Sequence, residues 1–402
     1  MTRQGLSQTL PMKLSLLVVL TLGVRGAAGC AASSVDDQSA PSSDLDGGRT
    51  ETIPGIDGSS DASVEASIED GSAPTSDECS SDGWCVVPLE LRGVAVYSVW
   101  GSGPNDVWAV GSWGTVLHYD GKKWSTSRVL TDAGQPKTLI SVWGSGPNDV
   151  WIASVDDIRH CDGWKEDGPD WSAAQILTKV DALPSQLLGV WGTGAKDVWV
   201  LHGANLLSVG LVTKVLHSEG WVDGSPSLKP AFDHVTSGTT SNISGIWASS
   251  PSDVWVVGDR GRIFRSNGFW GGMASWKQVN SNTHSHLRAV WGSASDDIWA
   301  VGDLGTIRHY THNEGGELVW SYVSSPTGSK LGSVWGSSGS DVWAVGEGGT
   351  IVHGDGTTWT TSSVPKAATN IPLYGVWGSG PNDVWIVGER LILHRGPAGV
   401  TK

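Results

Sequence analysis

The side chains of this 402-residue sequence that are capable of chemistry recur at regular intervals. Histidine occupies one equivalent position in six copies of a repeated unit, and arginine occupies it in the remaining copy. Imidazoles can bind a metal or transfer a proton, but zinc needs its ligands about 2 Å from one common centre. Equivalent positions around a ring do not converge, so we predict a structural role, in polar contact with a neighbouring tryptophan or the backbone, for His118, His160, His217, His309, His353, His394 and Arg265.

An aspartate also occupies one fixed position in every copy. Aspartate in a turn commonly accepts hydrogen bonds from backbone N–H groups, and we predict that role for Asp106, Asp149, Asp197, Asp253, Asp297, Asp341 and Asp383. A glycoside hydrolase of the sialidase type would need converging arginines, an activated nucleophile and a proton donor. The sequence contains no recognisable set of this kind, so no catalytic residue, metal site or cofactor is predicted.

These positions belong to seven copies of one unit. The first tryptophan of each copy stands at 100, 143, 191, 247, 291, 335 and 377. A period in the low forties, with turn residues about every ten positions, is typical of four-stranded propeller blades. We therefore predict an all-β, seven-bladed β-propeller with four antiparallel strands per blade, called A to D. In the first copy they cover residues 96–101, 106–111, 115–119 and 123–129.

Tryptophan is mainly a framework residue in this pattern. Strands A and B each supply seven of the 24 tryptophans, and strand D is predicted to supply Trp124, Trp171, Trp221, Trp276, Trp320, Trp359 and Trp84. The last copy stops after its third strand, whereas Trp84 follows an Asp-Gly turn ahead of the first complete copy. We expect this N-terminal strand to complete blade seven and to close the ring, which removes exposed sheet edges.

The variable loops of the repeats fall on one face. The A–B and C–D turns share one face, called here the A–B face, and the B–C and D–A connections share the other, called the B–C face. Most length variation lies on the B–C face: an eight-residue insertion in the B–C loop of blade three, and long connections around 172–186, 223–242 and 363–372. Variable loops on a rigid scaffold commonly carry binding residues.

The B–C face is predicted to hold an acidic mouth with an aromatic platform, suited to a sugar, a cation or a basic protein segment. The candidate ligand-binding residues are Trp113, Asp156, Asp259, Arg260, Asp303, Glu347, Glu389 and Arg390. The alternative is that they are solvated turn residues beside a stray tryptophan. Trp164 and Trp270 lie in C–D insertions of the opposite face and are weaker candidates.

The repeats resemble those of known propellers. The run from Gly111 to Trp124, Gly-Ser-Trp-Gly-Thr-Val-Leu-His-Tyr-Asp-Gly-Lys-Lys-Trp, resembles repeats of BNR/Asp-box, photosystem-assembly-factor-like and tectonin-type lectin propellers. It departs from an Asp-box because His118 stands where serine or threonine belongs and glycine directly follows the aspartate. The resemblance covers residues 83–395 and implies the fold only. The sequence also resembles repeat-bearing surface lipoproteins of Gram-negative bacteria.

The first residues are typical of an export signal. Arg3 and Lys13 precede an apolar run over 14–24, which is too short to span a bilayer, so residues 1–29 are predicted to be a signal peptide. Residues 27–30, Ala-Ala-Gly-Cys, resemble the lipobox of bacterial lipoproteins, which implies lipidation of Cys30. Ordinary cleavage nearby is the alternative. Ala31, rather than aspartate, follows the cysteine, which implies an outer-membrane lipoprotein facing the cell surface or the periplasm.

The segment after Cys30 is strongly acidic. Residues 31–82 hold 13 acidic side chains against one base and few large apolar residues, so 30–82 is predicted to be a disordered tether. Residues 83–396 form the predicted propeller and 397–402 a tail. In an oxidising compartment the close spacing of Cys79 and Cys85 predicts a disulfide, and Cys161 is expected to be a small buried hydrophobic residue.

The net charge of −15 makes nucleic acid a poor partner. These features together predict a non-enzymatic, membrane-anchored, monomeric binding module of the bacterial envelope, lectin-like or adhesive, with carbohydrate as its ligand. The alternative is an assembly or scaffold protein of the envelope that docks a protein partner. Sugar binding should depend on exposed aromatic residues such as Trp113, whereas protein docking should spread over the acidic rim.

Overall fold

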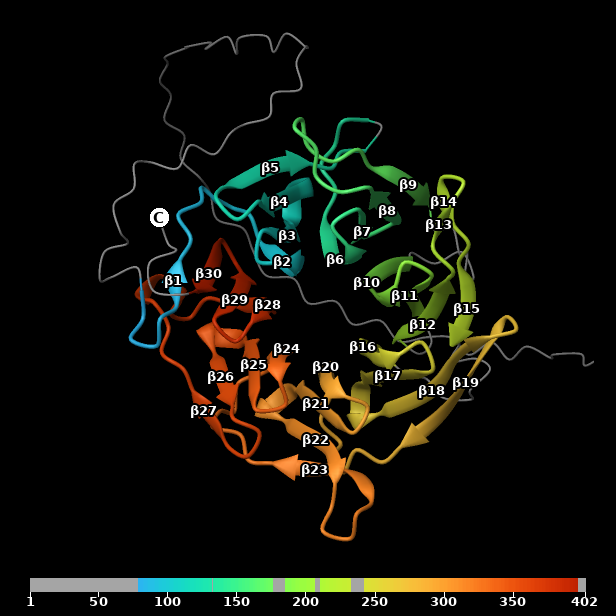
Figure 1. Cartoon of the computed structure of the whole chain (residues 1–402), viewed down its shortest axis with the longest axis vertical. Coiled ribbons are helices and arrows are strands. Elements are labelled where there is room, and N and C mark those ends of the chain that lie inside the picture. Colours follow the sequence, from blue (N-terminus) through green and yellow to red (C-terminus); the bar gives the residue numbers. More distant parts are fainter. Residues whose placement is uncertain (1–78, 132, 176–184, 207–209, 233–241, 397–402) are drawn as a thin grey trace, which may run out of the picture. The chain divides into compact units, whose positions relative to one another are not determined.

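The described part of the chain is a ring of seven sheets. The computed structural model describes residues 79–396, except 132, 176–184, 207–209 and 233–241. Each blade is a four-stranded antiparallel sheet whose strand A lies nearest the centre and whose strand D lies outermost (Figure 1). The predicted fold class is confirmed. The predicted signal peptide, the lipidated Cys30, most of the tether and the C-terminal tail lie outside the described residues.

The strands follow the repeats in order. Blades one to three are formed by β2 (Val96–Gly103), β3 (Asp106–Gly111), β4 (Thr115–Tyr119) and β5 (Trp124–Arg128); β6 (Leu139–Gly146), β7 (Asp149–Ser154), β8 (Asp157–Cys161) and β9 (Ser172–Gln175); and β10 (Ser185–Gly194), β11 (Asp197–Leu206), β12 (Gly210–Ser218) and β15 (Lys229–Phe232). Blades four and five are formed by β16 (Ile243–Ser250), β17 (Asp253–Gly258), β18 (Ile263–Trp270) and β19 (Met273–Val279); and β20 (Leu287–Ala294), β21 (Asp297–Gly302), β22 (Ile307–His312) and β23 (Leu318–Val323). Blades six and seven are formed by β24 (Leu331–Ser338), β25 (Asp341–Gly346), β26 (Ile351–Gly354) and β27 (Trp359–Thr361); and β28 (Leu373–Gly380), β29 (Asp383–Gly388), β30 (Leu391–Arg395) and β1 (Cys85–Val86).

The B strands are apolar at consecutive positions because neighbouring blades cover both of their faces. In β3, residues 107–110 are fully buried. The A strands pack against each other through a tryptophan that lies over a glycine of the next blade. A Cβ atom on Gly144 would lie 2.6 Å from Cη2 of Trp100, and Gly101 and Trp377 repeat this contact across the ring closure. Only glycine permits this close approach without displacing the ring.

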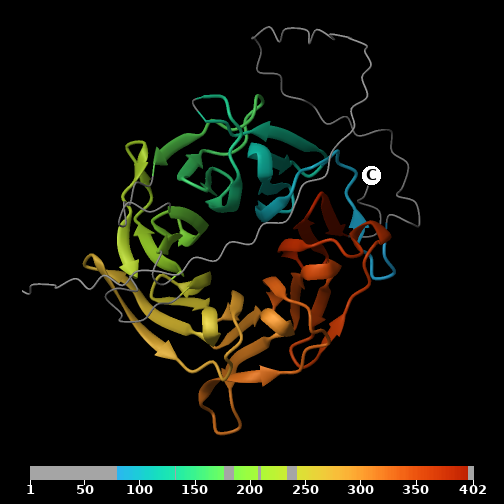
Figure 2. The same ribbon diagram turned by 180° about the vertical axis from the view of Figure 1, so that it is seen from behind.

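The tryptophans at or near the outer strands also join successive blades. Each packs edge-on against the strand-B tryptophan of the preceding blade, at centroid distances of 5.2–6.1 Å. Trp84 makes this contact with Trp343, which places it in blade seven. β1 pairs with β30, with Cys85 opposite His394. The ring is therefore closed by the N-terminal strand, as predicted, and Figure 2 shows the closed ring from behind.

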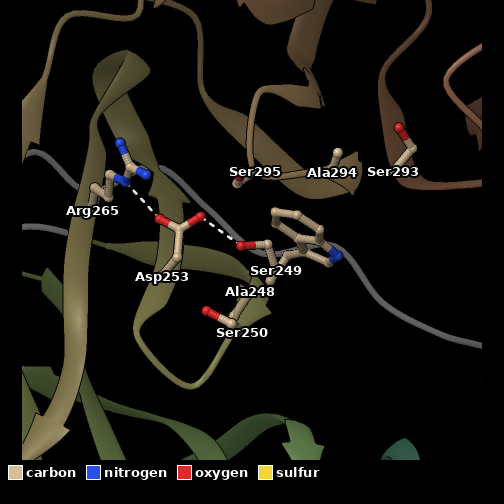
Figure 3. Close-up of a pocket in the computed structure, with 9 residues that line it drawn as sticks. Ala248, Ser249, Ser250, Asp253, Arg265, Ser293, Ala294 and Ser295 are labelled. Atoms are coloured by element: carbon tan, nitrogen blue, oxygen red, sulfur yellow. Dashed lines mark hydrogen bonds and ion pairs between the residues drawn. The ribbon is translucent and has the colours of Figure 1, made fainter.

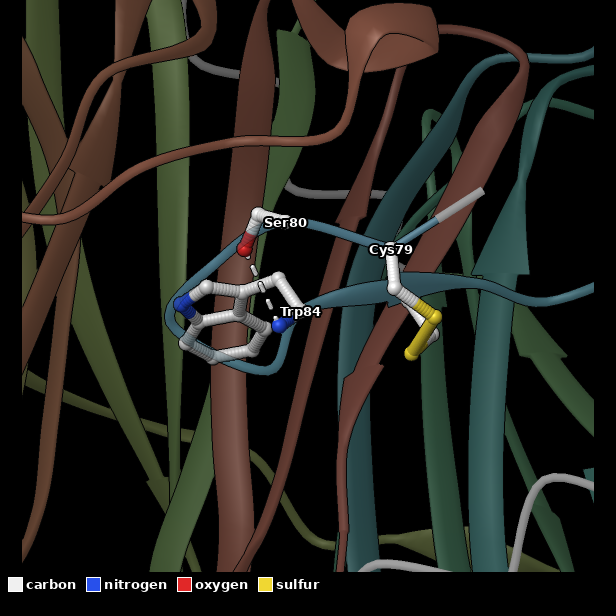
Figure 4. Close-up of a disulfide and its surroundings, with 4 residues drawn as sticks. Cys79, Ser80 and Trp84 are labelled. Atoms are coloured by element: carbon white, nitrogen blue, oxygen red, sulfur yellow. Dashed lines mark hydrogen bonds between the residues drawn. A yellow bond between two sulfur atoms is a disulfide. The ribbon is translucent and has the colours of Figure 1, made fainter. Parts of the chain in front are cut away.

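The cysteines are as predicted where the structure describes them. Cys79 and Cys85 form a disulfide beside Trp84, whose backbone N–H donates to Ser80 Oγ (Figure 4). Cys161 is free and buried in the core between blades one and two. Burial raises the pKa of its thiol to about 12, which makes it inert as a nucleophile at neutral pH.

Blade three departs from the sequence prediction at Trp221. This residue lies in a separate two-stranded hairpin, β13 (Trp221–Val222) and β14 (Ser225–Pro226), and strand D is β15. The connection after β12 is long enough to form that hairpin before the sheet is completed. Trp221 still packs edge-on against Trp151, at 5.3 Å. The predicted insertion in the B–C loop of this blade lengthens β11 and β12, with Leu206 opposite Gly210.

Candidate functional site

A polar network lies at the A–B turn of each blade. In blade one, Ser102 Oγ donates to Asp106 Oδ2 (2.5 Å), and Asp106 Oδ1 accepts from Trp108 Nε1 (2.8 Å) and contacts His118 Nε2 (2.8 Å). Asp106 and Trp108 are two residues apart on one face of β3, and His118 is the strand partner of Trp108. The three side chains therefore converge on the carboxylate.

The network recurs around the ring with local changes. Complete sets of hydroxyl, carboxylate, indole and imidazole are Ser145, Asp149, Trp151 and His160; Thr193, Asp197, Trp199 and His217; and Ser337, Asp341, Trp343 and His353. In blades five and seven, His309 and His394 contact their aspartates and stack on the strand-B tryptophans, at 3.7 Å. The polar partner of these histidines is therefore the aspartate rather than the predicted tryptophan or backbone, and their contact with tryptophan is a stacking of rings.

The predicted partners of the repeated aspartates are wrong. Their described hydrogen bonds go to side chains rather than to N–H groups of the turn. The physical reason is strand alternation: the aspartate begins strand B and directs its side chain to the face that holds the tryptophan two residues further on. These imidazoles and carboxylates hold the frame together and are not arranged around a common ligand.

The network predicts a loss of stability in acid. Burial alone would raise the pKa values of Asp106, Asp149, Asp197 and Asp383, but hydrogen bonds, first from histidine and then from serine or threonine, hold these pKa values below the ordinary 3.8. A lowered folded-state pKa stabilises the fold above the unfolded-state pKa, and that contribution disappears as the pH falls through the folded-state value.

We therefore expect the free energy of unfolding to fall steeply below about pH 4, where carboxylates begin to protonate. Urea unfolding followed by tryptophan fluorescence across this range measures the effect. Asp106→Asn, which cannot ionise, should show a shallower dependence on pH than the parent protein. An equal slope in the two proteins would contradict this account.

The predicted binding residues occupy the B–C turns of six of the seven blades, blade three being the exception. Four of these turns are single 3-10 turns: η1 (Ser112–Gly114), η2 (Asp259–Gly261), η3 (Asp303–Gly305) and η4 (Glu347–Gly349). Their central residues have positive φ, and so does Arg390 in blade seven. The eight predicted residues therefore lie at or near equivalent positions around the B–C face.

The acids of the predicted mouth have partners within their own blades. Asp303 accepts from Arg288 Nε and Nη2 (2.8 and 3.0 Å), and Asp259 accepts from Arg262 Nη1 (3.2 Å). The further pairs are Asp156 with Lys137, Glu347 with Lys330, and Glu389 with the hydroxyl of Tyr374. Burial, together with Glu389, raises the pKa of Tyr374 to about 12. The basic partners reduce the negative charge that the rim presents to a ligand, whereas the hydroxyl of Tyr374 is neutral.

Trp113 is an exposed aromatic residue of the B–C face. Its side chain is 58% exposed although its backbone has φ 57°, a left-handed conformation that costs a non-glycine residue roughly 1–2 kcal/mol. The N–H of Val129 donates to the carbonyl of Gly114 (2.8 Å), which holds the next D–A connection beside η1. Leu130 of that connection and Val155 of the blade-two B–C turn are also exposed. We call Trp113, Leu130 and Val155 the Trp113 patch.

Two hollows lie on the A–B face instead, on either side of the blade-four A–B turn. One, of about 600 Å³, is lined by Trp247, Ala248, Ser249, Ser250, Asp253, Arg265, Ser293, Ala294 and Ser295 (Figure 3). The other, of about 560 Å³, includes Lys196, Glu219, Phe269 and Trp270. The first hollow has no counterpart among the residues predicted from the sequence. The feature of the sequence that marks this hollow is Arg265, which stands where the other six blades have histidine.

The two weaker tryptophan candidates differ in their surroundings. Trp164 stacks on His118, with centroids 4.9 Å apart and an interplanar angle of 11°, so it extends the framework. Trp270 is 62% exposed at the tip of the β18–β19 hairpin. Within the described ranges, no three histidine, cysteine, aspartate or glutamate side chains gather as a metal site. No helix in the described part of the chain has the length and apolarity needed to cross a membrane.

Solved structures with the same fold include two of YCF48. YCF48 from Cyanidioschyzon merolae matches with a TM-score of 0.60 and 20% identity, covering 78% of this chain and 99% of that one. YCF48 bound to D1 peptide matches with a TM-score of 0.57 and 17% identity, covering 78% and 94%. The likeness is one of fold alone.

A third similar structure is the extracellular domain of the putative one-component system BT4673 from B. thetaiotaomicron. It matches with a TM-score of 0.56 and 14% identity, covering 78% of this chain and 40% of that one. No protein-family model matches the sequence, and no curated protein does. The similar structures agree with the propeller resemblance found in the repeats.

Proposed function

We propose that this protein is a non-catalytic propeller that docks a segment of a protein partner on its B–C face, with Trp113 as the anchor. The observation that carries the proposal is the exposure of Trp113 in a strained conformation, where blade six has Gly348. Tryptophan is among the residues that contribute most to protein interfaces.

The surroundings of Trp113 favour a protein segment over a sugar. Leu130 and Val155 add apolar surface, and the charges nearby are paired, as in Asp156 with Lys137. Both hollows described above lie on the opposite face. A shallow apolar patch with a polar border is typical of protein interfaces. One of the structures of similar fold is of YCF48 bound to a D1 peptide, which supports peptide docking by a propeller of this type.

Carbohydrate binding is the second candidate, because an exposed indole ring is also a platform for a sugar. Each candidate can be tested on the whole chain with its own probe: a display library of random short peptides, and a glycan array. Saturable binding to a sugar class that is lost in Trp113→Ala, with no peptide enriched, would replace the protein-docking proposal by a lectin.

The matched variants are Trp113→Ala and Leu304→Ala. Leu304 has the same φ of 57° at the same turn position in blade five and is 80% exposed. We expect Trp113→Ala to weaken binding of the selected peptides about tenfold or more, as for a central interface residue, and Leu304→Ala to change it less than about twofold. Peptides that bind both variants equally would sink the proposal.

We further propose an envelope location, with export by residues 1–29 and a lipid on Cys30 that anchors a monomer to the outer membrane. Arg3, Lys13, the apolar run and the lipobox-like residues 27–30 support this proposal. Incorporation of a labelled fatty acid into the parent protein but not into Cys30→Ser is the direct check. Labelling of both proteins would rule out this attachment point.

A further inference from the structure

Blade four breaks the repeated network at Arg265. In the other six blades the equivalent histidine contacts the strand-B aspartate through Nε2. Arg265 makes the same contact, with Nε donating to Asp253 Oδ1 (2.6 Å), and its guanidinium lies 4.8 Å from the centroid of the Trp255 ring. The framework bond therefore uses only one of the five N–H groups of the arginine.

The rest of the guanidinium is available to a ligand. Neither Nη atom of Arg265 has a hydrogen bond within the described part of the chain, and its side chain is 38% exposed, compared with 5–32% for the six histidines. Arg265 lines the hollow of about 600 Å³ between the A–B turns of blades four and five (Figure 3). That volume is in the range of small-molecule sites.

Small hydroxylated side chains form the walls of this hollow. Ser249 and Ser293 donate to Asp253 and Asp297. Ser250 and Ser295 also line the space, and their hydroxyls can donate to or accept from a ligand. Where blades one, two and seven carry Gly-Pro-Asn in this turn, blade four carries Ser-Pro-Ser and blade five Ala-Ser-Asp. The lining is therefore polar and suited to a ligand rich in hydroxyl groups.

We propose that this hollow binds the carboxylate of a sugar acid, with Arg265 as its carboxylate receptor and the serine hydroxyls as partners for the sugar. A planar guanidinium pairs with a carboxylate through parallel hydrogen bonds. Asp253 already balances the charge of Arg265 and Asp297 lies close by in blade five, which favours a single negative charge over a phosphate dianion. This site is on the opposite face from the Trp113 patch and does not depend on it.

The test uses the whole chain and galacturonate as the probe, with binding measured by calorimetry and by saturation-transfer NMR. The neutral sugar galactose tests the need for the carboxylate, inorganic phosphate tests the preference for one charge, and the α-amide of N-acetylglutamate, which carries one negative charge, tests a carboxylate of peptide type. We expect saturable binding of galacturonate and at least about tenfold weaker binding of the other three compounds.

Arg265→His is the decisive variant, because it installs the residue that the other six blades use and so retains the contact with Asp253. We expect it to keep the melting temperature and to lose galacturonate binding about tenfold or more. Arg128→His makes the same substitution at an exposed arginine at the end of β5 in blade one and should leave binding unchanged.

Three results would overturn the proposal: no saturable galacturonate binding by the folded parent protein, equal binding by Arg265→His, or binding of the α-amide of N-acetylglutamate as tight as that of galacturonate. The last would assign the carboxylate to a peptide. None of these outcomes bears on Trp113, so failure here is distinguishable from failure of the protein-docking proposal.

Discussion

Replacing Trp84 by alanine is expected to lower the free energy of unfolding by about 3–5 kcal/mol, the range for removal of a fully buried tryptophan. The side chain is completely buried and packs edge-on against Trp343, with centroids 5.2 Å apart. Its indole N–H donates to Ser362 Oγ (3.2 Å). The substitution would leave a cavity where β1 completes blade seven, next to the pairing of this N-terminal strand with β30 near the other end of the described chain.

The attachment of β1 to β30 depends strongly on side chains because β1 is short. β1 contributes two paired residues to blade seven. Asp82 accepts hydrogen bonds from the N–H of Ser363 (2.6 Å) and the hydroxyl of Ser362 (3.0 Å). These bonds, and the one from the Ser363 N–H most of all, hold the pKa of Asp82 below its ordinary value. The Cys79–Cys85 disulfide restrains the same segment. Loss of Trp84 should therefore release β1 as a unit.

Urea unfolding measures the stability loss, and hydrogen exchange locates it. Trp359→Ala removes the equivalent contact, 5.4 Å from Trp299, inside continuous chain, and Trp113→Ala removes an exposed ring. We expect Trp84→Ala and Trp359→Ala to destabilise similarly, but only Trp84→Ala to speed exchange along β28, β29 and β30 before global unfolding. A Trp84→Ala protein as stable as Trp113→Ala would refute the closure argument.

The framework could be predicted from the sequence because each of its contacts is repeated. Trp100 and its six equivalents fix the period of the repeat. Because the last copy lacks a fourth strand, Trp84, which precedes the first complete copy, can be assigned to that strand. The fourth strand of blade three was misplaced because Trp221 stands at a plausible distance from strand C, while the turn that makes it a hairpin has no counterpart in other blades. Repeats predict shared features well and individual insertions poorly.

The candidate sites were harder to predict because they depend on contacts between turns of different strands or blades. Spacing alone placed Asp303 and Asp259 on one face, but it did not show their pairing with Arg288 and Arg262. The hollow at Arg265 forms only where the A–B turns of blades four and five meet. Leu130 gave no signal, because a single apolar residue in a connection is common on protein surfaces.

The connection that carries Leu130 is fixed by a buried ion pair, and breaking that pair should have the second large effect. Lys137 Nζ donates to Asp157 Oδ2 (2.7 Å) and Asp156 Oδ1 (2.8 Å), and Asp157 is 1% exposed. Burial alone would raise the pKa of Asp157, but hydrogen bonds from Lys137, Ser154 and Arg159 hold it below the ordinary value.

Lys137→Met is expected to destabilise the protein by about 3 kcal/mol at neutral pH, the lower end of the range for an orphaned buried charge, because Arg159 still pairs with Asp157 (3.0 Å). Without the lysine the pKa of Asp157 should rise, so protonation relieves the orphaned charge and the loss should shrink as the pH falls towards 4. Urea unfolding of the two proteins at pH 7 and about pH 4 measures this difference.

Adding Asp157→Asn to Lys137→Met tests the same cause at one pH. Asparagine removes the buried charge, so at pH 7 the double variant should recover part of the stability lost by Lys137→Met. This recovery should shrink as the pH falls towards 4, where protonation of Asp157 already relieves the single variant. Under conditions where Lys137→Met remains folded, the connection over 129–137 loses its buried attachment to blade two, and peptides that require Trp113 should bind more weakly. A stability loss equal at both pH values would mean that the methylene chain of Lys137, rather than its charge, holds this connection in place.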